Sequence, residues 1–106
     1  MALNPYYPDI FLHFQAQAMF QLGRYEDAVA SLKRRLVRNP GTDVSRVLLA
    51  ASYGHLGRFN GAREQWQEVF RVNPEYSLEH RRKALPYKNP SDFELVVDGL
   101  RKAALV

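Results

Sequence analysis

The sequence predicts an all-α fold made of stacked antiparallel helix pairs, and three observations support this prediction. The stretch Gln21-Leu22-Gly23-Arg24-Tyr25 returns as His55-Leu56-Gly57-Arg58-Phe59, with the two glycines 34 residues apart (57 − 23 = 34). Asn39-Pro40 returns as Asn73-Pro74 at the same offset. Between these turns, apolar residues recur every three or four positions, which is the period of an amphipathic helix. A repeat of this length is the size of one helix pair with its two connections.

The composition is that of an ordinary small domain. The chain has 106 residues, of which 46% are hydrophobic and 25% are charged, a balance that favours folding over disorder. It has no cysteine, which excludes disulfides and cysteine-based zinc sites and favours a cytoplasmic location. Its apolar runs are far shorter than the roughly 20 residues of a membrane span, and its N-terminus lacks the pattern of a signal peptide. We therefore expect a soluble chain.

The first unit is predicted to span residues 9–42. Residues 1–8 contain two prolines, which disfavour a helix, and we interpret them as the remnant of a preceding repeat or a linker. A first helix should run from Asp9 to Leu22 and end at Gly23, which adopts the left-handed conformation at no steric cost. A second helix should run from about Glu26 to Arg38. The apolar positions of the two helices are Phe11, Phe14, Ala18, Leu22, Ala28, Val29, Leu32 and Leu36.

The second unit, residues 43–76, repeats this arrangement, so that residues 9–76 form two tandem units. Thr42 is a suitable N-cap for its first helix, which should end before Gly57, and its second helix should run from about Asn60 to Val72. The apolar positions are Leu49, Ala50, Tyr53, Leu56, Ala62, Trp66, Val69 and Phe70. Small residues fall where the helices of each pair should cross, which lets their axes approach to about 8 to 10 Å. These residues are Ala16 and Ala28 in the first pair and Ala50 and Ala62 in the second.

Residues 77–106 begin a third unit and then depart from the repeat. Ser77 can cap a short helix that ends near Ala84, because prolines follow before any Leu-Gly turn. The stretch Ser91–Glu94 has the spacing of a capping box, which predicts a last helix to about Ala104. The end of a stack needs its apolar face covered, so we expect this helix to be a C-terminal cap. The residues available for its burial are Phe93, Val96, Val97 and Leu100.

Taken together, these positions resemble the tetratricopeptide repeat. The resemblance covers about Asp9 to Pro74 and rests on the small residues, the Leu-Gly-x-aromatic inner turn and the proline that closes each unit. It implies a right-handed superhelical stack that acts as a protein-interaction scaffold. The matching residues are Ala16, Gly23, Tyr25, Ala28, Leu32 and Pro40 in the first unit and Ala50, Tyr53, Gly57, Phe59, Ala62, Trp66 and Pro74 in the second.

The tail is similar to a second group of proteins. Leu85–Asp92 and Asp98–Ala103 look like the carboxyl end of bacterial proteins that join an adenylate or guanylate cyclase domain to tetratricopeptide repeats. This resemblance implies that the chain is part of a larger signalling protein whose catalytic domain lies elsewhere.

The side-chain chemistry gives no candidate catalytic or metal site. His13, His55 and His80 do not stand three or four residues from one another or from a carboxylate pair, as metal ligands on a helix do. We expect these histidines to be partly exposed. Gly23 and Gly57 are explained as helix ends, so they do not indicate a phosphate-binding loop. We therefore predict no enzymatic activity, no cofactor and no metal for this chain.

Binding of a protein or peptide is the function that remains. In tetratricopeptide-type stacks the first helix of each unit lines a concave face, and the resemblance places nine residues there. They are Ile10, His13, Gln17, Phe20 and Gln21 of the first unit and Val44, Val47, Ala51 and His55 of the second. This face is apolar with amide and imidazole groups, which suits an extended or helical segment, whereas the Lys/Asn/Arg clamp for a terminal carboxylate is absent.

An equally weighted alternative is that these side chains pack against neighbouring units or against a second copy in a homo-oligomer. In either case we expect Phe20→Asp with Val47→Asp to abolish association and to leave the helicity intact.

The formal net charge of +4 suggests a second class of function, a nucleic-acid-associated regulator. Its candidate residues are Arg34, Arg35, Arg81 and Arg82. However, cations at the end of a helix also oppose the negative end of its dipole. Neither cluster is interleaved with the exposed aromatics that stack on bases, so nucleic acid is the less favoured partner.

Overall fold

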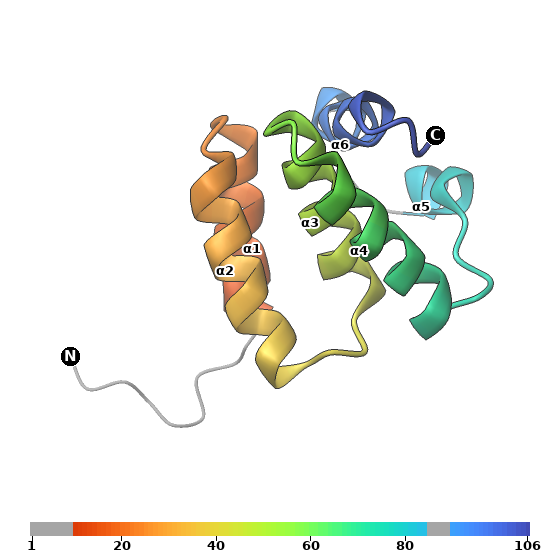
Figure 1. Cartoon of the computed structure of the whole chain (residues 1–106), viewed down its shortest axis with the longest axis horizontal. Coiled ribbons are helices and arrows are strands. Elements are labelled where there is room, and N and C mark those ends of the chain that lie inside the picture. Colours follow the sequence, from red (N-terminus) through yellow and green to blue (C-terminus); the bar gives the residue numbers. More distant parts are fainter. Residues whose placement is uncertain (1–9, 85–89) are drawn as a thin grey trace.

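The computed structural model describes residues 10–84 and 90–106, and in this part of the chain every regular element is an α-helix (Figure 1). The helices are α1 (Ile10–Gln21), α2 (Tyr25–Arg38), α3 (Asp43–His55), α4 (Phe59–Val72), α5 (Leu78–Ala84) and α6 (Pro90–Lys102). The all-α prediction is thus confirmed for the described residues, and the predicted helix bounds differ from these by no more than about two residues. The interpretation of residues 1–8 and the predicted start at Asp9 lie outside the described ranges.

The first four helices form two antiparallel pairs that stand side by side (Figure 1). Helix α1 packs on α2 and helix α3 packs on α4, while α3 also packs against α2 and joins the two pairs. The four alanines predicted at the crossings are completely buried: Ala16, Ala28, Ala50 and Ala62. The right-handed superhelix that the resemblance implies stays a prediction.

The two inner turns have the same geometry, as the repeated sequence predicts. Gly23 has a φ of +79° and Gly57 a φ of +77°, both in the left-handed region. The N–H of Arg24 donates to the Met19 carbonyl at 2.8 Å, and the N–H of Arg58 donates to the Tyr53 carbonyl at 2.9 Å. Each of these bonds closes a Schellman-type helix end, so both turns use glycine for the same reason.

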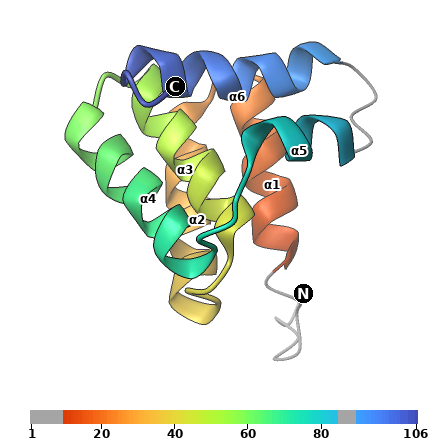
Figure 2. The ribbon, with the colours of Figure 1, turned by 90° about the vertical axis from the view of Figure 1, so that its right-hand side faces the viewer.

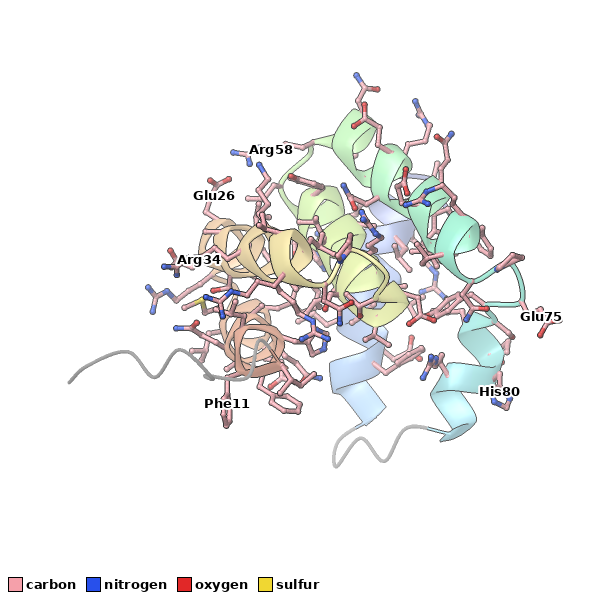
Figure 3. The ribbon with its side chains drawn as sticks, turned by 90° about the horizontal axis from the view of Figure 1, so that it is seen from below. Phe11, Glu26, Arg34, Arg58, Glu75 and His80 are labelled. Atoms are coloured by element: carbon pink, nitrogen blue, oxygen red, sulfur yellow. The ribbon has the colours of Figure 1, made fainter. Side chains whose placement is uncertain are left out.

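Helix α1 is apolar around most of its circumference. The residues that it buries are not the apolar positions from which the helix was predicted, which are Phe11, Phe14, Ala18 and Leu22. Ala16 and Phe20 are buried, whereas Leu22 is 74% exposed and Phe11 points outward from the helix bundle (Figure 3). The residue 34 positions after Phe11 is Ser45, which is completely buried because Arg35 of α2 lies against it. The periodicity therefore predicted the helix correctly without predicting which of its faces is covered.

Of the two predicted side-chain caps within the described residues, the structure confirms the one at Ser77 but not the one at Thr42. Ser77 caps α5 as predicted, since its hydroxyl accepts the N–H of His80 at 3.2 Å. Thr42 occupies the N-cap position of α3 but makes no cap hydrogen bond through its side chain. The Asp43 carboxylate instead accepts the N–H of Val44 at 2.7 Å. The capping box at Ser91 involves a side chain outside the described set.

Asp43 connects the start of α3 to the last part of the chain. Its carboxylate accepts the amide N–H of Asn73 at 2.9 Å and a guanidinium N–H of Arg81 at 3.3 Å. Burial alone would raise the pKa of Asp43, but these two partners and the N–H of Val44 hold it below the ordinary value. The ionised carboxylate therefore fixes α5 beside the start of α3.

Aromatic side chains fill the space between α4 and the turn that follows it. Trp66 meets the edges of Phe70, at 5.2 Å between ring centroids, and of Tyr76, at 6.1 Å. The Arg81 guanidinium lies 5.9 Å from the centroid of the Tyr76 ring. This cluster packs the second pair against the segment leading to α5.

Helix α6 packs against α3 and lies across it (Figure 2). The four residues that we expected to be buried in the last helix, Phe93, Val96, Val97 and Leu100, are indeed buried. The main contacts of α6 are with α3, the first helix of the second pair, and its role as a cap of the stack stays a prediction. Its position determines which part of the predicted binding face stays open.

Candidate protein-interaction groove

A cavity of about 420 Å³ opens between α1, α3, α5 and α6. Helix α1 contributes Ile10, His13, Phe14, Gln17, Phe20 and Gln21; α3 contributes Val44, Val47 and Leu48; and the later segments contribute Tyr76, Arg81, Phe93 and Val96. We call this cavity the groove. Its lining is mostly apolar with a few amide, imidazole and guanidinium groups, and its volume lies in the range of known ligand pockets.

The groove brings together seven of the nine residues predicted for the binding face. They are Ile10, His13, Gln17, Phe20, Gln21, Val44 and Val47. The other two, Ala51 and His55, do not line it. Ala51 has no exposed surface, and the His55 ring is hydrogen-bonded to the Leu95 carbonyl of α6. The predicted face is therefore divided into an open part over α1 and the start of α3, and a part beneath α6.

Phe20 and Val47 line the groove but belong to the hydrophobic core, and this overturns one expectation. Phe20 is 1% exposed and Val47 is 5% exposed. An aspartate at either position would place a carboxylate in an apolar interior, which costs several kcal/mol. The expectation that Phe20→Asp with Val47→Asp would leave the helicity intact does not fit this burial. Phe14 is 54% exposed and is a better position for testing the groove.

His13 lines the groove and contacts two buried residues of other helices that lie behind this lining, and we call the three residues the polar floor of the groove. The side-chain N–H of Arg35 donates to the Ser45 hydroxyl oxygen at 2.7 Å, and His13 Nδ1 lies 2.9 Å from the same oxygen. Burial and the Arg35 charge lower the pKa of His13 to about 4. The imidazole is therefore neutral at pH 7, and its Nδ1 can accept the Ser45 hydroxyl proton. Side chains from α1, α2 and α3 meet at this point.

Arg35 itself is buried, so this candidate of the nucleic-acid alternative is not on the surface. A charge inside the fold must be paired or hydrogen-bonded, and Ser45 supplies one such bond. Arg81, the other cation near the groove, is paired with Asp43. Two of the four arginines of the nucleic-acid alternative thus have structural roles, whereas Arg34 is exposed (Figure 3).

His55 joins α3 to α6. Its Nε2 donates to the Leu95 carbonyl at 2.8 Å, and the Lys102 ammonium donates to Nδ1 at 3.1 Å. The ring stacks on Tyr25 at 4.5 Å between centroids. Burial lowers the pKa of His55, and the Lys102 charge adds to this effect, although the Leu95 carbonyl opposes it. The neutral ring has one nitrogen that donates and one that accepts, so it can bind the Leu95 carbonyl and the Lys102 ammonium at the same time.

Several residues of the groove were missed by the sequence analysis. Phe14 and Leu48 are separated by the repeat offset of 34 and directly follow the predicted His13 and Val47, so a slightly wider predicted face would have included both. Tyr76, Arg81, Phe93 and Val96 come from segments outside the two first helices. Their presence depends on how α5 and α6 fold back, for which the sequence of the repeats carries no signal.

Two other kinds of feature are absent from the described residues. In the ranges 10–84 and 90–106 there is no group of three or more His, Cys, Asp or Glu side chains that could hold a metal ion. None of the helices in these ranges combines the length and apolar character needed to cross a membrane.

The described residues form a small all-helical chain with an open, mostly apolar groove, and comparison with known proteins gives a relative. A comparison with protein families gives no match. The chain is 46% identical over 44 residues to the protein named Putative adenylate cyclase 3 of Rhizobium meliloti (strain 1021). The match covers 42% of this chain and 8% of that protein, so the chain spans only a small part of the relative's length.

Proposed function

We propose that the chain is a protein-interaction module of a larger, cyclase-associated signalling protein and that it has a tetratricopeptide-type scaffold. The groove takes an apolar segment of a partner protein or of a second chain. The observation that carries this proposal is the meeting of seven predicted binding-face residues in one open, mostly apolar cavity. The similarity to a protein named as an adenylate cyclase supports the signalling context.

The test replaces an apolar side chain that lines the groove and is exposed. Phe14→Asp should reduce capture of partners from the native host at least tenfold, because the charge would lie where an apolar segment docks. Val37→Asp is the matched control, since Val37 is also exposed but lies on α2 and does not line the groove. Sedimentation of both variants tests self-association in the same way. Equal capture and equal self-association of both variants would contradict the proposal.

Catalysis is proposed to lie outside this chain. We expect no cyclic nucleotide above the blank when the purified chain is incubated with ATP or GTP and a divalent cation. Formation of cyclic AMP or cyclic GMP that scales with chain concentration would refute this expectation.

Nucleic-acid binding is not proposed, because Arg35 and Arg81 are engaged inside the fold. A titration at low salt checks this choice, since binding through phosphates is strongest there. Binding that weakens steeply as salt is added, and that is lost in Arg34→Glu, would favour the alternative.

A further inference from the structure

The outward side of α1 carries the apolar positions from which the helix was predicted. Phe11, Phe14 and Leu22 are all exposed there, and so is the small Ala18 between them. The Phe11 ring is 47% exposed and points away from the other helices (Figure 3). The four residues follow one another at spacings of three, four and four, so they form one row along the helix. We call this row the α1 stripe.

The corresponding side of α3 is buried, and a neighbouring helix lies against it. The residues 34 positions after Phe11 and Ala18 are Ser45 and Ser52, and both are completely buried. Helix α2 packs against α3, and its Arg35 donates to the Ser45 hydroxyl oxygen at 2.7 Å. This side of the helix therefore accepts another helix in the second pair. In the first pair, no helix of residues 10–84 and 90–106 covers it.

The charge distribution favours a second copy of the chain as the occupant of the α1 stripe. The sequence of α1 (Ile10–Gln21) has no charged residue, whereas each of the other helices in the described ranges has at least two. The chain has a net charge of +4, so two copies repel one another unless they meet at a neutral surface. On α2, for example, Lys33, Arg34 and Arg38 are all exposed. Two copies therefore meet at the lowest electrostatic cost through α1.

The α1 stripe is also complementary to itself when two copies pack in opposite directions about a two-fold axis. With the axis near position 16, midway between Phe14 and Ala18, the phenylalanine of each copy lies opposite the alanine of the other. Phe11 then lies opposite the region of Leu22, because these two residues have nearly the same midpoint. The alanine permits close approach of the two helix axes, as at the crossings inside the chain.

We infer that the α1 stripe is a homodimer interface in which α1 of one copy packs antiparallel to α1 of the other. This inference goes beyond the function proposed above, because Phe11, Ala18 and Leu22 do not line the groove. Phe14 lies at the edge that the stripe and the groove share. A helix of 12 residues is about 18 Å long, so the contact is small and the dimer is reversible.

Sedimentation equilibrium of the unmodified chain tests the dimer. The mean mass should rise from 12.3 kDa in dilute solution toward twice that value as the concentration approaches about 1 mM. A chain that stays at 12.3 kDa over this range would overturn the inference. This measurement needs no variant, so it also decides the case in which a variant does not fold.

Two variants place a charge in the α1 stripe outside the groove. Phe11→Lys and Leu22→Glu should each weaken dimerisation at least tenfold, because the charge would lose water in an apolar contact. Val37→Lys and Val37→Glu are the matched controls, since they change the net charge equally at an exposed position of α2. The controls should dimerise like the unmodified chain. Equal dimerisation of the α1 variants and their controls would place the interface elsewhere.

A mixture of the two α1 variants tests the direction of packing. In the antiparallel dimer, one contact brings the introduced lysine to the introduced glutamate, while the other keeps the original Leu22 and Phe11. The mixture should therefore associate at least tenfold more tightly than either variant alone at low salt. No gain on mixing, with both variants folded by circular dichroism, would refute the antiparallel contact. These experiments use no partner from the host, so a monomeric chain leaves the capture test with Phe14→Asp unaffected.

Discussion

Replacing Gly54 by alanine tests the helix crossing on which the position of α6 depends. In an ordinary helix interior this change stabilises by about 1 kcal/mol, because alanine is the better helix former. Here the added Cβ would lie 1.9 Å from the Gly99 carbonyl oxygen, whereas ordinary contact begins at 3.4 Å. Helix α6 would have to move by about the difference (3.4 − 1.9 = 1.5 Å). A gap of 0.5 to 1 Å already removes about a quarter to a half of the dispersion energy between packed atoms.

Overpacking of a well-packed core costs about 1 to 3 kcal/mol, and more where backbone must move. The forced backbone movement places Gly54→Ala at the upper end of this range, and after subtracting the gain in helix propensity of about 1 kcal/mol we expect the free energy of unfolding to fall by about 2 kcal/mol. Far-UV circular dichroism during urea and thermal unfolding measures this change, and the melting temperature should fall by roughly 10 °C or more.

Gly61→Ala is the matched control. Its Cβ would lie 3.2 Å from the Tyr53 ring, a side chain that can give way slightly, so its stability should stay within about 1 kcal/mol of the unmodified chain. A Gly54→Ala chain as stable as the Gly61→Ala chain would refute the close crossing.

Three further predictions concern the core, the polar floor of the groove and the inner turns. Phe20→Ala should lower the free energy of unfolding by about 3 to 5 kcal/mol in urea titrations, since the ring is buried; a loss below about 1 kcal/mol would contradict that burial. For His13, the pKa is lowered from 6.5 to about 4 in the folded chain, so the unfolded chain binds the proton first as the pH falls. The free energy of unfolding should therefore be fully maintained above pH 6.5 and fall by about 3 kcal/mol toward pH 4, and His13→Gln should flatten this dependence. Gly23→Ala and Gly57→Ala should each lower the free energy of unfolding by about 1 to 2 kcal/mol, because both positions have a positive φ. The new Cβ atoms would have open space around them, so no steric clash adds to this loss. Clearly unequal costs for the two glycines would show that the turns are not equivalent.

The features set by local chemistry could be predicted from the sequence. Gly23 and Gly57 indicate helix ends because a left-handed residue favours glycine, and the structure has both in that conformation. Ala28 and Ala62 indicate helix crossings because a small side chain permits close approach, and both are completely buried. Both inferences depend only on residues that are close in the sequence or one repeat apart.

The features set by distant segments could not be predicted in this way. Periodicity shows that Ala51 and His55 share a helix face, but not that α6, some forty residues later, covers it. The burial of Arg35 could not be predicted either, because its partner Ser45 is a small polar residue with no distinctive pattern in the sequence. A signal for the crossing was nevertheless present, since Gly54 and Gly99 both interrupt otherwise helical segments, where glycine is costly without a packing reason.

The aromatic cluster at the end of α4 has a practical consequence. Trp66 is the single tryptophan of the chain, and it is packed edge-on against Phe70 and Tyr76. Its intrinsic emission is therefore a label-free optical reporter of one defined place, the junction between the second helix pair and the segment that leads to α5. Spectroscopists can follow that junction in the unaltered chain, while the absence of cysteine leaves thiol chemistry free for a second, site-specific dye anywhere else.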